Sequence, residues 1–404
     1  MATPATPAED IYFNPWDPEY RANPYPSYRA MLKGPPRVIN LITPIALVAR
    51  YADCAQVLRD HERFSSVQPP EMMPPPDGNP FHGSPTMLFS DPPVHTRLRR
   101  LISREFAPRR IRELEPRIRE ITNSLLEAAA SKGELEVMGD LANVLPVMVI
   151  AEMLGVPAER YETFKHWSDL IIAADNTLPG NPLPPEIREA RHSLADYFRD
   201  EIERRKREPG PDLVSALVAA HQEGEKLTAG ELLNFVVLLL LAGNETTTNL
   251  IGNGMLALGR NPDQMALLRS EPTLIGRAVE EMLRYDGPVQ STVRHPIGDV
   301  ELAGVKLSRG TAAFIILAAA NRDPAEFKDP ERFDIMREPR DNLAFGEGIH
   351  FCLGAPLARL EAAIAIGTAL ERLPQLRLAD PEAKLEYKGS YFLRGLSALP
   401  MAAD

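Results

Sequence analysis

Apolar side chains recur at helical spacing through most of the chain, whereas strand-like runs are short. A spacing of three and four residues indicates one face of a helix, and alternation indicates a strand. Helices are expected over residues 26–32, 51–59, 93–105, 109–130, 140–154, 158–174, 186–207, 211–222, 229–260, 262–269, 273–285 and 355–373. Strands are expected over 37–40, 46–50, 291–297, 300–302, 305–307 and 312–317, with another short pair within 385–400. The pattern therefore predicts a mainly α protein with small peripheral β-sheets.

One expected helix is much longer than the others. Thr228 and Glu231 have the spacing of a capping box, and the apolar pattern continues until Asn261 and Pro262. About 30 residues at 1.5 Å each give about 45 Å, so this helix is expected to run through the core. Residues 242–247 interrupt its apolar pattern with polar side chains. Because burying polar groups unpaired is costly, they must find local partners or face water and a ligand.

Composition limits the classes of function. The chain has 404 residues, and its 45 basic and 56 acidic side chains give a net charge of −11, which argues against nucleic acid as a partner. Two cysteines make no disulfide framework and fit a reducing compartment. The first residues do not resemble a signal peptide, and the longest strongly apolar run, 235–243, is too short to span a bilayer. A soluble, cytoplasmic protein without a membrane span is expected.

The most informative segment is 345–354, Phe-Gly-Glu-Gly-Ile-His-Phe-Cys-Leu-Gly, which places Cys352 between a glycine-rich bend and an expected helix. The free N–H groups of a helix start favour a thiolate. A lone cysteine is more often a small buried hydrophobe, which is the interpretation preferred for Cys54. His350 and Cys352 could also be half of a zinc site, but zinc needs three or four ligands.

As written, FGxGxHxCxG resembles the haem-binding loop of the cytochrome P450 family, and the resemblance extends over essentially the whole chain. It implies the P450 fold in a single domain over residues 1–404, with haem b as cofactor and no fused reductase domain. Cys352 would be the axial metal ligand, a thiolate whose electron donation favours O–O cleavage. The other haem-binding residues of this loop would be Phe345, Gly346, His350 and Gly354.

The long helix carries further matches to the family. Ala242 and Gly243 would leave room for oxygen above the iron. Glu245 and Thr246 match the acid and the alcohol of a proton relay, in which the hydroxyl bonds the oxygen and the carboxylate exchanges protons with solvent. The alternative for Thr246 is a hydroxyl that bonds back to its own helix.

Charged residues at matched positions are assigned to structural and haem-binding roles. Glu281 and Arg284 share one helix face and match the ExxR pair, with Arg332 expected as their third partner. On its own, such a pair is more often a solvated surface pair. Buried propionates need cations, and four matched candidates are His95, Arg99, Arg294 and His350. The alternatives are a solvated helix face and an edge-strand charge.

A basic cluster comprises Arg97, Arg100, Arg104, Arg109, Arg110 and Arg112. It is either a solvated helix face or, given the resemblance, a surface where an acidic ferredoxin docks. The ferredoxin would bring electrons from NAD(P)H through a reductase.

Matched positions also imply a distal pocket lined by Leu88, Leu238, Leu241, Ala242, Gln290, Ser291, Phe392 and Leu393, although each residue taken singly could be core. The mostly apolar lining indicates a hydrophobic small molecule, oriented by few polar contacts such as Gln290. Proline-rich loops at 68–86 and 178–186 would cover this pocket.

The resemblance therefore implies a monomeric haem-thiolate monooxygenase that uses O₂ to hydroxylate or epoxidise its substrate. An H₂O₂-driven peroxygenase and a non-catalytic haem binder or sensor are the alternatives. The presence of Glu245 and Thr246 weighs against both.

Overall fold

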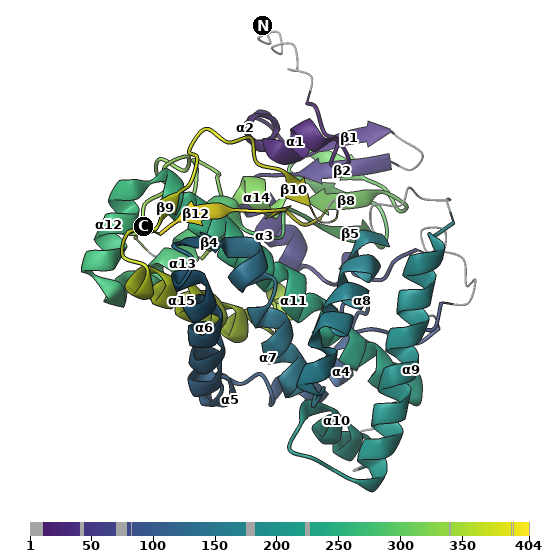
Figure 1. Ribbon diagram of the computed structural model, residues 1–404. Coiled ribbons are helices and arrows are strands. Elements are labelled where there is room, and N and C mark those ends of the chain that lie inside the picture. The colour runs from purple at the N-terminus through teal and green to yellow at the C-terminus, as the bar shows by residue number, and fades with distance from the viewer. Residues whose placement is uncertain are drawn as a thin grey trace, which may run out of the picture.

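Helices make up the lower part of the molecule in Figure 1, and the small sheets lie above them. The structure is a computed structural model that describes residues 11–40, 44–69, 79–81, 83–174, 182–222, 227–338, 341–388, 390 and 392–403. Its α-helices are α1 (Pro18–Ala22), α2 (Tyr25–Leu32), α3 (Tyr51–Arg59), α4 (Val94–Ser103), α5 (Pro108–Glu113), α6 (Glu115–Ala130), α7 (Leu145–Met153), α8 (Tyr161–Ala173), α9 (Pro185–Arg207), α10 (Leu213–Gln222), α11 (Ala229–Arg260), α12 (Pro262–Ser270), α13 (Ile275–Asp286), α14 (Leu317–Ala320) and α15 (Ala355–Arg372). The mainly α fold class is confirmed.

The main sheet has the strand order β1-β2-β8-β5-β3, in which β2 and β8 pair in parallel and the other neighbours are antiparallel. Its strands are β1 (Arg37–Asn40), β2 (Pro44–Val48), β3 (Phe64–Ser65), β5 (Thr292–Pro296) and β8 (Ala312–Ile315). The smaller sheets combine β4 (Glu134–Glu136), β12 (Pro400–Ala402) and β9 (Arg377–Leu378), β6 (Val300–Leu302) with β7 (Val305–Leu307), and β10 (Tyr387–Lys388) with β11 (Gly395–Leu396).

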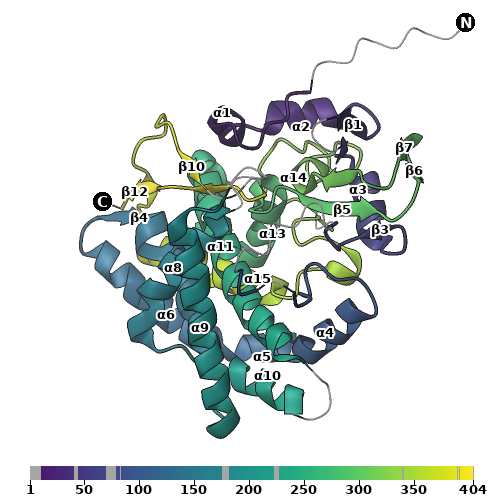
Figure 2. The same cartoon turned by 90° about the vertical axis from the view of Figure 1, so that its right-hand side faces the viewer.

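Helix α11 runs through the main core, where it packs against α7, α13 and α15 (Figure 2). Its capping box is present: Thr228 accepts from the N–H of Glu231, and the Glu231 carboxylate accepts from the N–H of Thr228. By length and composition α11 could cross a membrane, but 72% of its most apolar window is buried inside the protein. The burial is that of a core helix, as the sequence predicts.

Prolines break two helices that the pattern predicts as continuous. The helix expected over 109–130 ends at Glu113 and starts again at Glu115, because Pro116 has no N–H for the preceding turn. The helix expected over 140–154 becomes a π-helical segment, Val137–Ala142, followed by α7 with Pro146 in its first turn. The strand expected over 312–317 ends at Ile315, and α14 begins at Leu317.

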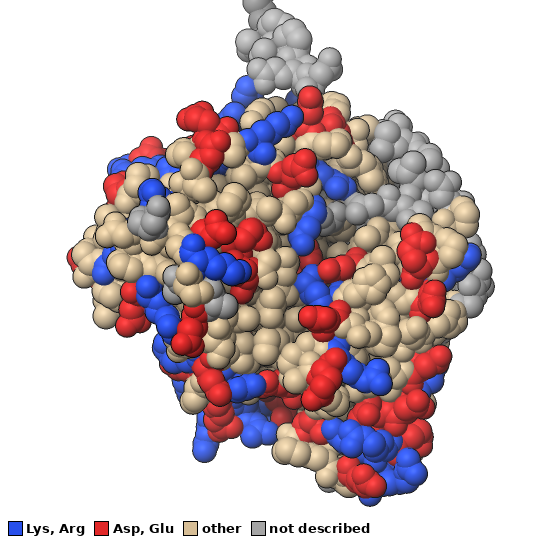
Figure 3. All heavy atoms as spheres, viewed as in Figure 1, with Lys and Arg blue, Asp and Glu red and all other residues tan. Residues whose placement is uncertain are grey.

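Acidic and basic side chains are interspersed over the face shown in Figure 3. Many of them pair within one helix. On α9, Arg199 lies 2.6 Å from Asp196, and Lys206 lies 2.6 Å from Glu203. The net negative charge is therefore spread among locally paired residues on this face, where each exposed pair contributes little to stability.

Candidate functional site

The loop before α15 is folded by glycines and by one backbone bond. Gly346 and Gly348 have φ of +70° and +71°, a conformation that side-chain-bearing residues rarely adopt. A Cβ on Gly348 would also lie 2.5 Å from the carbonyl oxygen of Leu58. The N–H of Cys352 donates to the carbonyl of Phe345 at 2.9 Å, which closes the loop. Cys352 therefore stands just before the first turn of α15.

Opposing effects act on the Cys352 thiol. Burial raises its pKa, whereas the N–H groups of Gly354 and Ala355 and the charges of Arg99 and Arg359 lower it. The N–H groups at the start of α15 thus favour the thiolate, as the sequence predicts, but burial has the larger effect on the pKa. A coordinated metal ion deprotonates a thiol outright.

Two histidines and two arginines gather beside this loop. The rings of His95, on α4, and His350 have centroids 4.1 Å apart. Arg99, one turn after His95, donates to the carbonyl of Phe351 at 2.6 Å, which ties α4 to the cysteine loop. Arg294, on β5, is 7% exposed. Three elements distant in sequence thus bring four basic side chains together.

Burial and neighbouring cations lower the pKa values of this cluster. Burial, followed by the charge of Arg99, lowers the pKa of His95 to about 4. Burial and the charge of Arg294 lower the pKa of His350 to about 3, and burial lowers that of Arg294 to about 10. Asp91 opposes the shifts of His95 and Arg294. Among the described residues, His95 Nε2 is buried without a hydrogen-bond partner. The cluster fits a dianionic ligand.

The relay candidates lie on α11. The hydroxyl of Thr246 donates to the carbonyl of Ala242 at 2.7 Å, which is the bond back to its own helix. Glu245 is 4% exposed and accepts from Asn249 Nδ2 at 3.3 Å. Of the two alternatives for this polar segment, the Glu245 carboxylate therefore has a local partner in the conformation described, and its exchange of protons with solvent stays a prediction.

The two small residues of α11 have different surroundings. Ala242 is exposed, as a position facing a ligand would be. A Cβ on Gly243 would lie 3.3 Å from the side chain of Ile150, on α7. The glycine therefore lets α11 approach α7, and its role in leaving room for oxygen stays a prediction. The sequence holds no local signal for this packing.

The ExxR pair is buried. Glu281 and Arg284 have side chains 3% exposed and are joined by two bonds of 2.7 and 2.8 Å. The third side chain on Glu281 is Arg337, whose Nε donates to both carboxylate oxygens at 3.1 and 3.2 Å. Arg332, expected in this role, is exposed and contributes only its backbone carbonyl, which accepts from Arg284 and Arg337 at 3.2 and 2.9 Å.

The predicted substrate contacts come from several elements. Leu88 is 48% exposed on the segment before α4. Four half-buried residues are Leu238 and Leu241 on α11 and Phe392 and Leu393 near the C-terminus. Ser291 and Gln290 are buried, at 5% and 8% exposed. Of the proline-rich loops, residues 70–78, 82 and 178–181 lie outside the described residues.

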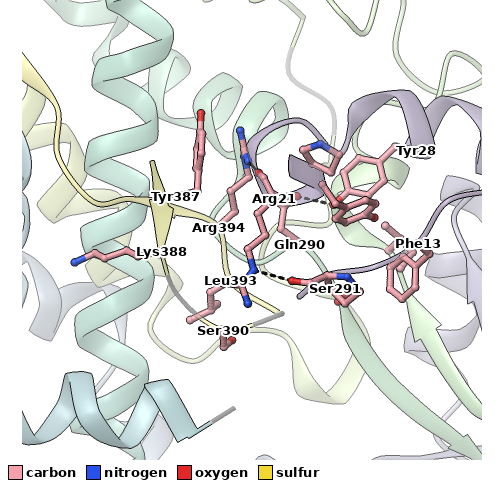
Figure 4. Close-up of a pocket in the computed structure, with 14 residues that line it drawn as sticks. Phe13, Arg21, Tyr28, Gln290, Ser291, Tyr387, Lys388, Ser390, Leu393 and Arg394 are labelled. Carbon is pink, nitrogen blue, oxygen red and sulfur yellow. Dashed lines mark hydrogen bonds between the residues drawn. The ribbon is translucent and has the colours of Figure 1, made fainter. Parts of the chain in front are cut away.

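The amide of Gln290 is not directed at a ligand. Its Oε1 accepts from the hydroxyl of Tyr28 at 2.7 Å (Figure 4). Its Nε2 donates to the carbonyl of Gly287 at 2.7 Å. The expectation that Gln290 orients the substrate by a polar contact is therefore corrected. The partner, Tyr28, is 262 residues away in sequence, and no motif indicates it.

The six arginines predicted to form a ferredoxin-docking surface have different surroundings in the structure. Arg97 pairs with the buried carboxylate of Glu231 at the start of α11. Arg110 pairs with Glu105 at 3.2 Å and with Glu113 at 3.4 Å. The members that stay on the surface of α4, α5 and the turn between them are Arg100, Arg104, Arg109, Arg110 and Arg112.

The features of a haem-thiolate site are present: a cysteine before a core helix, a partly buried basic cluster beside it and an exposed alanine on a second core helix. The residues present fit the group: the basic cluster suits two propionates, and Cys352 suits the iron.

The chain belongs to the cytochrome P450 family, whose model, described as "Cytochrome P450", matches residues 36–388. The cytochrome P450 monooxygenase PikC of Streptomyces venezuelae is 43% identical over 95% of this chain and 92% of that protein. The vitamin D(3) 25-hydroxylase of Pseudonocardia autotrophica is 40% identical over 99% and 98%. The solved structure of myxobacterial cytochrome P450 CYP267B1 with myristic acid has a TM-score of 0.88 at 38% identity, covering 96% of this chain and 98% of that one. The chain is thus a cytochrome P450 monooxygenase that binds haem b.

Proposed function

We propose that this enzyme inserts one oxygen atom of O₂ into a mainly apolar small molecule, with Cys352 as the haem ligand and electrons from NAD(P)H. The observation that carries the proposal is the basic cluster beside the cysteine loop, in which His95 and Arg294 are buried and Arg99 and His350 are half-buried. A haem bound through a thiolate activates dioxygen for this reaction. The chain's own residues hold the haem, the proton and the substrate.

The basic cluster would bind the two propionates. Their charge would replace the anion that the cluster lacks, and His95 Nε2 would gain an acceptor. Phe345 would lie against the haem from the cysteine loop, held by Arg359, whose guanidinium is 4.6 Å from the ring centroid.

Thr246 and Glu245 would deliver the proton. The Thr246 hydroxyl would turn from the carbonyl of Ala242 toward the oxygen and hold the proton at Oγ1. The Glu245 carboxyl would then supply the next proton. Because Glu245 is 4% exposed and bonded to Asn249, its side chain has to rotate before it exchanges with solvent.

The substrate would be a small molecule with a large apolar part. Leu238, Leu241, Phe392 and Leu393 offer apolar surface to it, and Ser291 offers a hydroxyl. Two relatives support this class: one is named for vitamin D(3), and one was solved with myristic acid. Gln290 is left out of the contacts because both ends of its amide have protein partners.

An acidic ferredoxin would deliver the electrons at the surface arginines of α4 and α5. This surface is basic within a chain whose net charge is −11, so it would steer an acidic partner. Arg97 is not part of the docking surface, because its guanidinium pairs with Glu231.

The reduced, CO-bound absorption spectrum tests the ligand assignment. Wild-type protein should give a strongly red-shifted Soret band, and Cys352→His should give a haem protein without that shift. Cys54→Ala is the matched control, because Cys54 is fully buried and its Sγ donates to the carbonyl of Val48 at 3.3 Å. A red-shifted band in Cys352→His would overturn the assignment.

Turnover of an apolar test substrate distinguishes the alternatives. Product formed with NAD(P)H, reductase and ferredoxin supports the proposal. Product formed with H₂O₂ alone, and none with the electron-transfer chain, would identify a peroxygenase. A normal CO spectrum without turnover under either condition, across a panel of apolar compounds, would favour a haem binder or sensor.

A further inference from the structure

Helix α2 contacts one edge of the proposed substrate pocket through Tyr28. The hydroxyl of Tyr28, which is 3% exposed, donates to Oε1 of Gln290 at 2.7 Å. The other end of the amide donates to the carbonyl of Gly287 at 2.7 Å. Figure 4 shows the two side chains pointing toward one another. Tyr28 thus holds Gln290 in one orientation.

Gln290 in turn joins two segments that carry proposed substrate contacts. Its N–H donates to the carbonyl of Phe392 at 2.8 Å, and its carbonyl accepts from the N–H of Ala318 at 3.1 Å. The N–H of Arg394 donates to the carbonyl of Pro288 at 2.8 Å. Residues 288–291 and 392–394 therefore form one hydrogen-bonded unit, called here the pocket wall.

The pocket wall has little space behind it. A cavity of about 30 Å³ separates the wall from the N-terminal segment, and Tyr20, Arg21, Tyr28 and Arg394 are among its lining residues. That volume is enough for about one or two water molecules. A side chain released at Gln290 could turn into this space and let the wall shift. The Tyr28 ring would stay in place, because it packs edge-on against the rings of Tyr20 and Tyr25.

We propose that Tyr28 is a positioning residue for the pocket wall, so that helix α2 helps to decide which apolar molecules the enzyme accepts. This rests on the proposed function, because it requires the wall to face the substrate. Tyr28 itself lies behind the wall and touches no substrate. Its role is carried by the bond to Gln290.

Tyr28→Phe removes this hydroxyl and keeps the ring. The dissociation constants of two azoles for the ferric haem-loaded protein, measured from absorption shifts, distinguish an effect on the wall from an effect on the iron site. Imidazole tests the iron site alone. 4-Phenylimidazole adds a phenyl group, which under this proposal contacts the wall. A neutral hydrogen bond corresponds to about a fivefold change in an equilibrium constant. We expect Tyr28→Phe to raise the dissociation constant of 4-phenylimidazole about fivefold and that of imidazole by less than about twofold.

Met31→Ala is the control for general loosening of α2. Met31 is on the same helix, is 4% exposed and packs in the apolar cluster that contains Tyr20 and Tyr28. The ratio of the two dissociation constants should be unchanged in this variant. An equal change of the ratio in Met31→Ala would attribute the effect to general loosening of α2 and overturn the proposal.

A double-mutant cycle tests the route. In a Gln290→Leu background, Tyr28→Phe should change the ratio no further, because the acceptor is already gone. Amide hydrogen exchange of Gln290 and Arg394 should speed up in Tyr28→Phe. An additive effect in the double mutant, or an unchanged ratio with unchanged exchange, would refute the proposal.

If Tyr28→Phe yields no haem-loaded protein, Gln290→Leu takes its place, because it removes the acceptor for the Tyr28 hydroxyl. The ratio of the two dissociation constants should then change in the same direction, and an unchanged ratio would refute the role of the bond. Wild-type protein that binds neither azole would contradict the proposed haem site instead, a separate failure.

Discussion

Arg337→Ala should destabilise the protein, whereas Arg332→Ala should not. Arg337 is 15% exposed and donates to both oxygens of the buried Glu281 carboxylate. It also donates to the carbonyls of Asp329 at 3.1 Å and Arg332 at 2.9 Å. Removing the guanidinium leaves Glu281 with one cationic partner, Arg284, and takes charged donors from the loop that follows α14.

The loss of stability in Arg337→Ala depends on how much of the pairing of Glu281 remains. Complete breakage of a buried ion pair costs about 3–5 kcal/mol. Glu281 keeps its two-bond partner, so the loss should be smaller, about 2–4 kcal/mol including the carbonyls. Arg332 has an exposed side chain, and its carbonyl survives truncation, so Arg332→Ala should change stability by less than about 0.5 kcal/mol.

Urea unfolding of the haem-loaded variants measures the free energy of unfolding, and the haem content per chain is determined on the same samples. Arg337→Lys should fall between wild type and Arg337→Ala, because an ammonium keeps the charge but not the planar fork. Equal losses in Arg332→Ala and Arg337→Ala would refute the assignment of Arg337 as the third partner. So would a normal midpoint and haem content in Arg337→Ala.

Two further predictions concern the core helices. Thr246→Ala should raise the NAD(P)H consumed per product and release peroxide, and unchanged coupling would contradict the relay. Burial raises the pKa of Glu361, on α15, well above 4.5 despite a hydrogen bond with Thr247. The folded protein therefore keeps a proton that the unfolded chain releases above about pH 4.5, and folding stability falls as the pH rises toward the folded-state pKa. The free energy of unfolding of Glu361→Gln minus that of wild type, measured in urea, should be larger at pH 8 than at pH 5. The same value at both pH values would indicate that the Glu361 carboxylate is ionised in the folded protein.

Local patterns predicted the regular elements well. The capping box and the stop at Asn261 and Pro262 set both ends of α11, because they act within one turn of the helix. The three-stranded sheet of β4, β12 and β9 was not predicted. Its strands are two or three residues long, so alternation had too few positions to appear, and β4 pairs with β12 across more than 200 residues of chain.

At the site too, features that depend on the local backbone could be predicted, whereas contacts between distant segments could not. The glycines of the cysteine loop act through their own backbone, so the sequence indicates their positions directly. The partner of Glu281 depends on how a loop without regular structure folds back, and Arg332 and Arg337 are chemically equal candidates for it.

Gln290 extends this argument to specificity. A matched position places a side chain near a pocket, but its direction is set by whichever donor the rest of the fold supplies. Here the donor is Tyr28, which comes from the N-terminal helix. A relative with Gln290 and no hydroxyl at the position of Tyr28 would leave the amide oxygen without this donor, and the amide could then turn toward a ligand. Substrate preference in such enzymes should therefore depend on pairs of residues rather than on the pocket position alone.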